Sequence, residues 1–292
     1  MASLKNIKEK ITGVKKTAKV TKAMESVSAV KMRRAQETAL SARKYAFHAF
    51  AILKRIAKIK STTVDDLFEQ REINKTCFIL ISPQKGLAGG INTFLAKKVS
   101  QEIEERSLTK ENTTFICIGK KGYEFANRQG FEVIEYYSDF DEKTEINVLK
   151  EVSTKALGLF NSKGEDKIDS FVSIYTNFIT TTEQKAVSRD ILPIKFDDVK
   201  KILVDIVPKD GKYSDVAGDI DIDSYDVNDY KFEPSVDEVT KSLVPYLLNF
   251  LIHYCILESS ASEHSARMVA MKNATDKAND IAKDLNLSLI HI

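Results

Sequence analysis

The chain has 292 residues, of which 43% are hydrophobic and 29% are charged, and its formal net charge is +2. This length allows one large domain or two of medium size, and the hydrophobic content is ordinary for a globular protein. The sequence lacks a run of about 18 apolar residues, and its first ten residues lack the apolar core of a signal peptide, so we expect neither a membrane span nor secretion by that route.

The first segment, residues 1–60, is predicted to form one long helix. Glycine and proline are absent from Val14 to Ser82, and about 55 helical residues make a rod of roughly 80 Å. Apolar or small residues recur at alternating steps of four and three, as in a coiled coil, and then shift as at a stutter. The first set is Leu4, Ile7, Ile11, Val14, Ala18 and Thr21, and the shifted set is Met24, Val27 and Val30 or Lys31.

Charge is distributed unevenly along the chain. Residues 1–60 hold sixteen Lys or Arg and three acidic residues, whereas residues 205–230 hold eight Asp and two Lys. A helix this basic favours a polyanionic neighbour, which could be an acidic protein, a nucleic acid or a membrane surface, over a merely solvated face.

The middle of the chain changes character. Short apolar runs, typical of strands buried on both faces, alternate with helical segments, which is the pattern of an open α/β sheet. Residues 205–233 are predicted to form loop and edge strand. The predicted strands are Thr76–Ser82, Thr113–Gly119, Glu132–Tyr137 and Phe171–Tyr175, and the predicted helices are Thr93–Glu105, Lys121–Arg128 and Glu145–Asn161.

A second long helix is predicted for residues 234–288, with Ser235 as its N-cap, Glu238 as the capping-box partner and Pro245 as the cause of a kink. A strict heptad seam follows, and a helix of this length needs an equally long partner. The seam residues are Leu243, Leu247, Phe250, Tyr254, Leu257, Ala261, His264, Met268, Met271, Thr275, Ala278, Ala282, Leu285 and Leu289.

We therefore predict an α/β fold in which a long antiparallel coiled coil of the N- and C-terminal helices carries an inserted open, Rossmann-like sheet domain. A helical bundle around one core is the alternative. The predicted divisions are 1–60 and 234–288 for the coiled-coil helices, 75–233 for the sheet domain and 288–292 for an atypical tail.

Motifs that could carry chemistry are weak. The glycine-rich stretch 86–93 could cradle a phosphate, but its spacing fits neither dinucleotide nor P-loop patterns, so a tight strand-to-helix turn is favoured. The Asp219–Asp223 repeat lacks the glycine and glutamate of a calcium loop. Ser259, Ser260 and His264 lie on a predicted helix without a pocket, so we expect no catalysis there. The cysteines Cys77, Cys117 and Cys255 are expected to be reduced and packed, and a metal or other cofactor has little support.

Two functional classes remain open on these observations alone. One is a mechanical or interaction subunit of a larger assembly, and the other is an α/β enzyme that uses the coiled coil to oligomerise. The lack of a polar constellation at the predicted strand ends favours the first.

The stretch 258–276, with the sequence ESSASEHSARMVAMKNATD, closely resembles the signature of the gamma subunit of F-type ATP synthase. The glycine-rich turn 85–92 and the segment 175–178 resemble that family in the expected order, and the similarity covers nearly the whole chain. The N-terminal positions that match are Ile7, Lys8, Ile11, Thr17, Lys19, Thr21, Lys22, Ala23, Met24, Val27 and Lys31.

The resemblance implies a non-catalytic rotor shaft, without cofactor or nucleic acid, that couples ion flow to ATP synthesis or hydrolysis. Its implied partners are the alpha and beta subunits around the coiled coil, and the epsilon subunit and membrane ring of c subunits at the foot. The implied location is the cytoplasmic face of a bacterial plasma membrane, or alternatively the matrix side of the mitochondrial inner membrane. The implied partner-contact residues are Lys22, Met24, Lys31, Arg33, Arg34, Tyr230, Glu263, His264, Arg267, Met268, Met271, Lys272 and Asp276.

Within that set, Lys22, Met24 and Arg267 are expected to face acidic loops of the catalytic subunits, and Lys31, Arg33, Arg34 and Tyr230 are expected at the foot. The last residues, 288–292, are expected to match nothing in the family, as in a truncated reading frame with a foreign tail.

Overall fold

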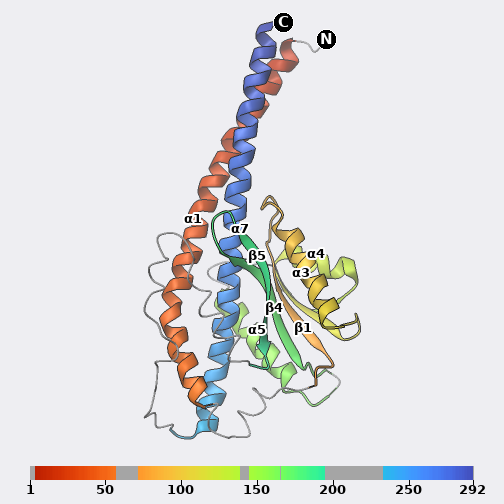
Figure 1. Ribbon diagram of the computed structural model, residues 1–292, viewed down its shortest axis with the longest axis vertical. Coiled ribbons are helices and arrows are strands. Elements are labelled where there is room, and N and C mark those ends of the chain that lie inside the picture. The colour runs from red at the N-terminus through yellow and green to blue at the C-terminus, as the bar shows by residue number, and fades with distance from the viewer. Residues whose placement is uncertain (1–3, 57–71, 139–144, 165, 195–232, 292) are drawn as a thin grey trace.

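Two long helices form a rod, and a smaller α/β body is attached to one side of it (Figure 1). The computed structural model describes residues 4–56, 72–138, 145–164, 166–194 and 233–291. Helix α1 spans Leu4–Ile56 and α7 spans Val236–His291. They run in opposite directions, so that both chain ends meet at the end of the rod that projects beyond the body (Figure 1).

The two helices keep one continuous seam. The hydroxyls of Thr21 and Thr275 lie 2.6 Å apart across it, and Ala35 packs beside Ala261 further along. The interval from Thr21 to Ala35 on α1 equals the interval from Ala261 to Thr275 on α7, and both are two heptads, so the pairing stays in step.

The predicted stutter after Thr21 is therefore wrong. Val27 and Val30 are each 56% exposed, while Ser28 and Ala35 are buried. The seam passes through small residues here, because small side chains allow the two helices to approach closely. A sequence prediction that looks for large apolar residues therefore selects the exposed valines and not the small residues of the true seam.

The body is a five-stranded sheet in the order β3-β2-β1-β4-β5. Strands β1 (Thr76–Ile81), β2 (Thr113–Ile118), β3 (Glu132–Tyr137) and β4 (Ser170–Phe178) are parallel, as predicted from their apolar runs. Strand β5 (Gln184–Leu192) pairs antiparallel with β4 and was not predicted. It lies at the edge of the sheet, and most of its side chains are only partly buried, which accounts for the charged residues in its sequence.

Helices cover both faces of the sheet. Side chains of β1 alternate, so that Phe78 and Leu80 pack on the face covered by α3 (Ile91–Glu105) and α4 (Lys120–Gln129). Cys77, Ile79 and Ile81 of the same strand pack on the other face, beneath α5 (Glu145–Phe160) and the first half of α7. The body therefore has two cores, one on each side of the sheet.

The first half of α7 belongs to the body and not to the free coiled coil. Its buried residues form a nearly continuous run that packs on the sheet and on α5 as well as on the partner helix α1, so this half has neighbours on more sides than a coiled coil alone would give it. An 18-residue window of α7, with mean hydropathy 1.2, is long and apolar enough to cross a membrane, but half of it is buried inside the protein. Packing on the sheet accounts for that apolar character.

The N-terminus of α7 is capped by Ser235 as predicted, and the reciprocal bond from the Glu238 side chain stays a prediction. The Glu238 backbone N–H donates to the Ser235 hydroxyl at 3.2 Å, which satisfies one of the free donors of the first turn. Pro245 lies inside the helix, and a kink there stays a prediction.

Candidate functional site at the neck of the rod

The neck is the level at which the coiled coil leaves the body, and three elements meet there. They are α7 from Glu258 to Arg267, the tip of the β4–β5 hairpin, and the glycine-rich turn between β1 and α3. This turn was predicted as a tight strand-to-helix connection, and it contains two residues with left-handed backbone, Leu87 (φ 61°) and Gly89 (φ 60°).

Arg267 binds the glycine-rich turn. Its Nη2 donates to the carbonyl oxygens of Lys85 at 3.3 Å and Gly86 at 3.2 Å. The same nitrogen forms an ion pair with Glu263 at 2.7 Å. Arg267 is 7% exposed, so its guanidinium is a bridge within this chain that joins α7 to the turn.

Burial and nearby positive charges shift the pKa values of Glu263 and His264 at the neck. Burial raises the pKa of Glu263, although Arg267 opposes the shift. Burial, together with the cations Arg267 and Lys31, lowers the pKa of His264 to about 4. His264 is therefore neutral near pH 7, and its Nδ1 lies 3.3 Å from Nη1 of Arg267, from which it can accept a hydrogen bond.

The outward face of α1 is both basic and apolar. Val20, Val27 and Val30 are each more than half exposed and recur at heptad-like spacing on the side away from the seam. Exposed cations flank them. They are Lys15, Lys16, Lys19, Lys22, Lys31, Arg33 and Arg34. We call the three valines and these cations the outer stripe.

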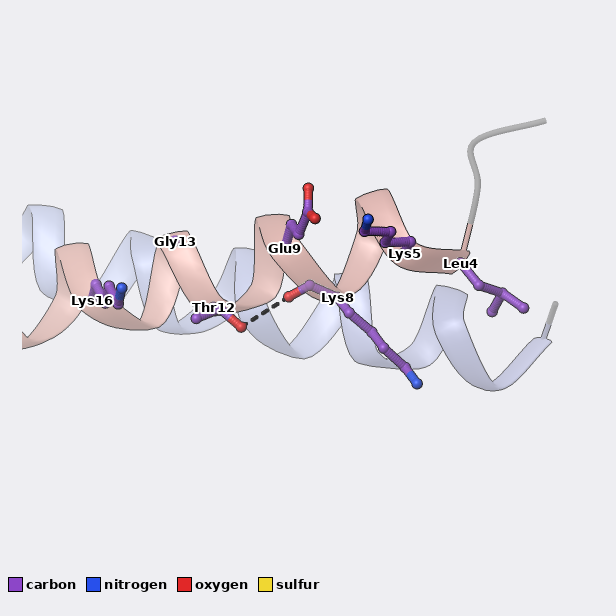
Figure 2. Close-up of a pocket in the computed structure, with 7 residues that line it drawn as sticks. All are labelled: Leu4, Lys5, Lys8, Glu9, Thr12, Gly13 and Lys16. Carbon is purple, nitrogen blue, oxygen red and sulfur yellow. Dashed lines mark hydrogen bonds between the residues drawn. The ribbon is translucent and has the colours of Figure 1, made fainter.

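The basic surface continues to the projecting end of the rod. Figure 2 shows a groove along the first turns of α1, whose hydrogen bond from the Thr12 hydroxyl to the Lys8 carbonyl is 2.9 Å long. Gly13 contributes no side chain to this surface. The groove is lined by Leu4, Lys5, Lys8, Glu9, Thr12, Gly13 and Lys16.

The structure separates the predicted contact residues into groups. Lys22, Lys31, Arg33, Arg34, Lys272 and Asp276 are exposed, and Met24, Glu263, His264 and Met268 are half-buried. Arg267 and Met271 are buried, and Arg267 uses its donors within the chain. Tyr230 lies outside the described residues. Contact of the exposed residues with a partner stays a prediction.

The placement of Lys31, Arg33 and Arg34 at the foot is corrected. Lys31 is close enough to His264 and Glu263 to shift the pKa of both, so it lies at the neck. Helix α1 continues to Ile56, which is more than 20 residues and roughly 35 Å further along the rod.

Sequence reasoning missed three polar residues on α7 that bind the hairpin. Glu258, Ser262 and Ser265 are buried and make hydrogen bonds to β4 or to the hairpin turn. Their spacing at i, i+4 and i+7 places them on one face of the helix. A polar stripe inside an otherwise apolar helix is the signal that could have revealed them.

The described residues offer little to a metal or a redox group. No three of their His, Cys, Asp or Glu side chains gather where they could hold a metal ion. All three cysteines are free and buried, and burial raises the pKa of each thiol to about 12. The thiols therefore stay protonated and unreactive near neutral pH.

A rod of two terminal helices with an inserted α/β body is the fold of the ATP synthase central stalk. The fold matches a chain from the central stalk and c-ring of the Tetrahymena thermophila mitochondrial ATP synthase, with TM-score 0.57 and 20% identity over 87% of this chain and 99% of that chain. It also matches a rotor chain from the Euglena gracilis mitochondrial ATP synthase, with TM-score 0.56 and 15% identity over 99% of this chain and 96% of that chain.

The sequence defines the family more narrowly. The ATP synthase family model matches residues 3–290, which includes part of the tail that was expected to match nothing. The ATP synthase gamma chain of Pelotomaculum thermopropionicum is 32% identical over 289 residues, covering 99% of this chain and 92% of that protein. The chain belongs to the ATP synthase gamma-chain family.

Proposed function

We propose that this chain is the rotating shaft of an ATP synthase and that it has no active site of its own. The outer stripe supports the proposal most directly. It is a long basic and apolar surface on a rod that extends beyond the body, and a monomer gains nothing by exposing it. Such a surface suits a surrounding ring of subunits with acidic and apolar inner faces.

The coupling follows from asymmetry. As the rod turns, it offers each subunit of the surrounding ring a different face, and a contact that differs between two conformations shifts their equilibrium. The partners that fit are the alpha and beta subunits around the rod, and the epsilon and c subunits at the body. The chain would be peripheral to the membrane through the complex, on the cytoplasmic face of a bacterial membrane or the matrix side of a mitochondrial one.

Capture of the tagged full-length chain from a detergent extract of the membranes tests the proposal. We expect the catalytic ATPase subunits to be recovered with it. A Val27→Asp, Val30→Asp variant should lose most of this recovery, because it places two carboxylates on the apolar part of the outer stripe.

Asn127→Asp, Gln129→Asp adds the same number of carboxylates at exposed positions of α4, on the body and away from the rod, and it is the matched control. If both variants recover the catalytic subunits equally well, the outer stripe is not part of the contact. A stable oligomer of the chain alone, with a melting temperature that rises with added nucleotide, would instead favour an independent enzyme.

A further inference from the structure

The tip of the β4–β5 hairpin lies where the two rod helices come together. Figure 1 shows the hairpin reaching α7 at the level of the neck. Phe178, the last residue of β4, is 7% exposed and packs in one cluster with Ala35 of α1 and Ala261 of α7. The hairpin therefore touches both helices with one aromatic ring.

Three hydrogen bonds join α7 to the hairpin backbone. The Phe178 N–H donates to Oε2 of Glu258 at 2.9 Å, and the Ser262 hydroxyl donates to the Thr176 carbonyl at 3.0 Å. The Ser265 hydroxyl donates to the Thr181 carbonyl at 2.7 Å. Ser262 and Ser265 are fully buried, so water cannot replace the partner that either bond supplies.

The hairpin turn is itself closed by hydrogen bonds. The Glu183 N–H donates to the Thr180 carbonyl at 3.3 Å and lies 3.0 Å from the Thr180 hydroxyl. The Ile179 and Thr180 N–H groups both donate to the Glu183 carbonyl. The acceptors that α7 binds are therefore held by the turn and by the β4–β5 ladder.

Hydrogen bonds fix an orientation in a way that apolar packing cannot. Burial of apolar surface has no direction, whereas a hydrogen bond weakens steeply with distance and angle. Two full turns of α7 are bonded to fixed backbone atoms through Glu258, Ser262 and Ser265. Rolling or sliding of the helix against the body would break all three bonds together.

We propose that the β4–β5 hairpin is a clamp that sets the rotational position of the coiled coil relative to the body. Glu258, Ser262 and Ser265 are its positioning residues, and Phe178 is the wedge that extends the clamp to α1. The inference rests on the shaft function proposed above, because only a molecule that carries torque needs this angle to be fixed.

The test is a rotation measurement on the assembled catalytic complex. The catalytic ring is fixed to a surface, and a bead is attached to the body through a Glu124→Cys substitution on α4, where Glu124 is exposed. The native cysteines are buried, so the label goes to this position. The angular spread of the bead is recorded during pauses, together with the rate of ATP hydrolysis.

The variant Ser262→Ala, Ser265→Ala should widen the angular spread and leave the hydrolysis rate unchanged. Loss of each hydrogen bond raises the population of the released state about five-fold, so the double variant should raise this population, and accelerate exchange of the Phe178 amide hydrogen, by up to about 25-fold. Each single variant should give an angular spread between those of the wild type and the double variant. If the double variant does not assemble, the complexes that carry the single variants are measured instead.

Ser242→Ala is the control, because the Ser242 hydroxyl is exposed and, among the residues that the structure describes, bonds only the Glu238 carbonyl of its own helix. An angular spread equal to that of this control would overturn the clamp. A wild-type bead that does not rotate would instead overturn the shaft function, so the two failures are distinct.

Discussion

The two halves of α7 have different partners and different compositions. Near Leu251 the helix is buried on nearly all sides by the sheet, α5 and α1, and large apolar residues follow one another with only Asn249 and His253 between them. Near Ala278 it has one buried stripe, made of small residues that face α1, and charged residues elsewhere. One uninterrupted helix therefore serves as a core element at its start and as half of a slender rod at its end.

This difference shows that stability and function are concentrated in separate regions. The buried half contributes most of the apolar burial that α7 provides, and burial of apolar surface is the main favourable term in folding. The projecting half buries little, and it pairs with the part of α1 that exposes the outer stripe. Substitutions in the buried half should therefore cause large losses of stability, whereas substitutions in the projecting half should cause small ones.

The largest effect is expected from Leu251→Ala. Leu251 is fully buried in the core between the sheet and α7, so truncation leaves a cavity and should lower the free energy of unfolding by about 3 kcal/mol. Ile281→Ala, on the projecting half of the same helix, should cost less than about 1 kcal/mol, because Ile281 is 39% exposed. Denaturant unfolding of both variants measures the contrast, and equal losses would contradict it.

The next largest effect is expected at the neck from Arg267→Met. The variant leaves the Glu263 carboxylate and two carbonyls of the glycine-rich turn without their donor, and it should cost about 2–3 kcal/mol of unfolding free energy. The double variant Arg267→Met, Glu263→Leu removes the stranded charge and should be more stable than the single one. Greater loss in the double variant would show that the ion pair is not what Arg267 contributes.

A pH effect is expected from His264. Its pKa in the folded chain is about 4, below the ordinary 6.5, so the unfolded chain binds a proton there first as the pH falls. Stability that is present above pH 6.5 should be lost between pH 6.5 and 4, by about 2 kcal/mol after allowance for solvent screening.

Melting temperatures of the wild type and His264→Gln, compared at pH 7 and pH 5, measure this effect. The variant should lose less stability on acidification. Glu263 acts in the opposite sense, because its raised pKa favours the folded chain at low pH, and it is present in both proteins. Parallel losses in the two proteins would rule out His264 as the source.

The smallest effect is expected in the projecting half, from the Thr21–Thr275 pair. Each hydroxyl has a single proton, so one of the two donates across the seam while the other donates to a carbonyl of its own helix. When either hydroxyl is removed, the other can still donate to that carbonyl. A double-mutant cycle with Thr21→Val and Thr275→Val should give a coupling of about 0.5–1 kcal/mol. Thr12→Val, whose hydroxyl bonds only within α1, should show no coupling to Thr275→Val.

Apolar content made the body predictable. The buried strands β1, β2 and β4 were found because strands covered on both faces read as continuous apolar runs, and the start of α7 was found from Ser235 and Glu238. Strand β5 was missed because an edge strand mixes charged and apolar residues. The seam beyond Thr21 was misplaced because Ser28 and Ala35 are too small to stand out against Val27 and Val30.

The neck was less accessible from sequence. Arg267 was expected to face a partner because of the family resemblance, and nothing in its sequence neighbourhood reveals the carbonyl groups, about 180 residues away, that it binds. Ser262 and Ser265 could not be recognised as hairpin ligands for a related reason, because β5 and the turn before it were not predicted. The cations of the outer stripe, in contrast, were visible in the sequence, whereas its valines Val27 and Val30 were assigned to the seam.

The small side chains of the seam also determine how the shaft bends and twists. Alanine, serine and threonine at the contact bring the two helix axes close together, so the projecting part of the rod is thinner than a leucine-rich coiled coil would be. The torsional rigidity of a rod is proportional to the fourth power of its radius, so a thinner rod twists more easily. Beyond the neck the molecule should therefore act as a torsion spring, able to store part of each rotational step and return it later.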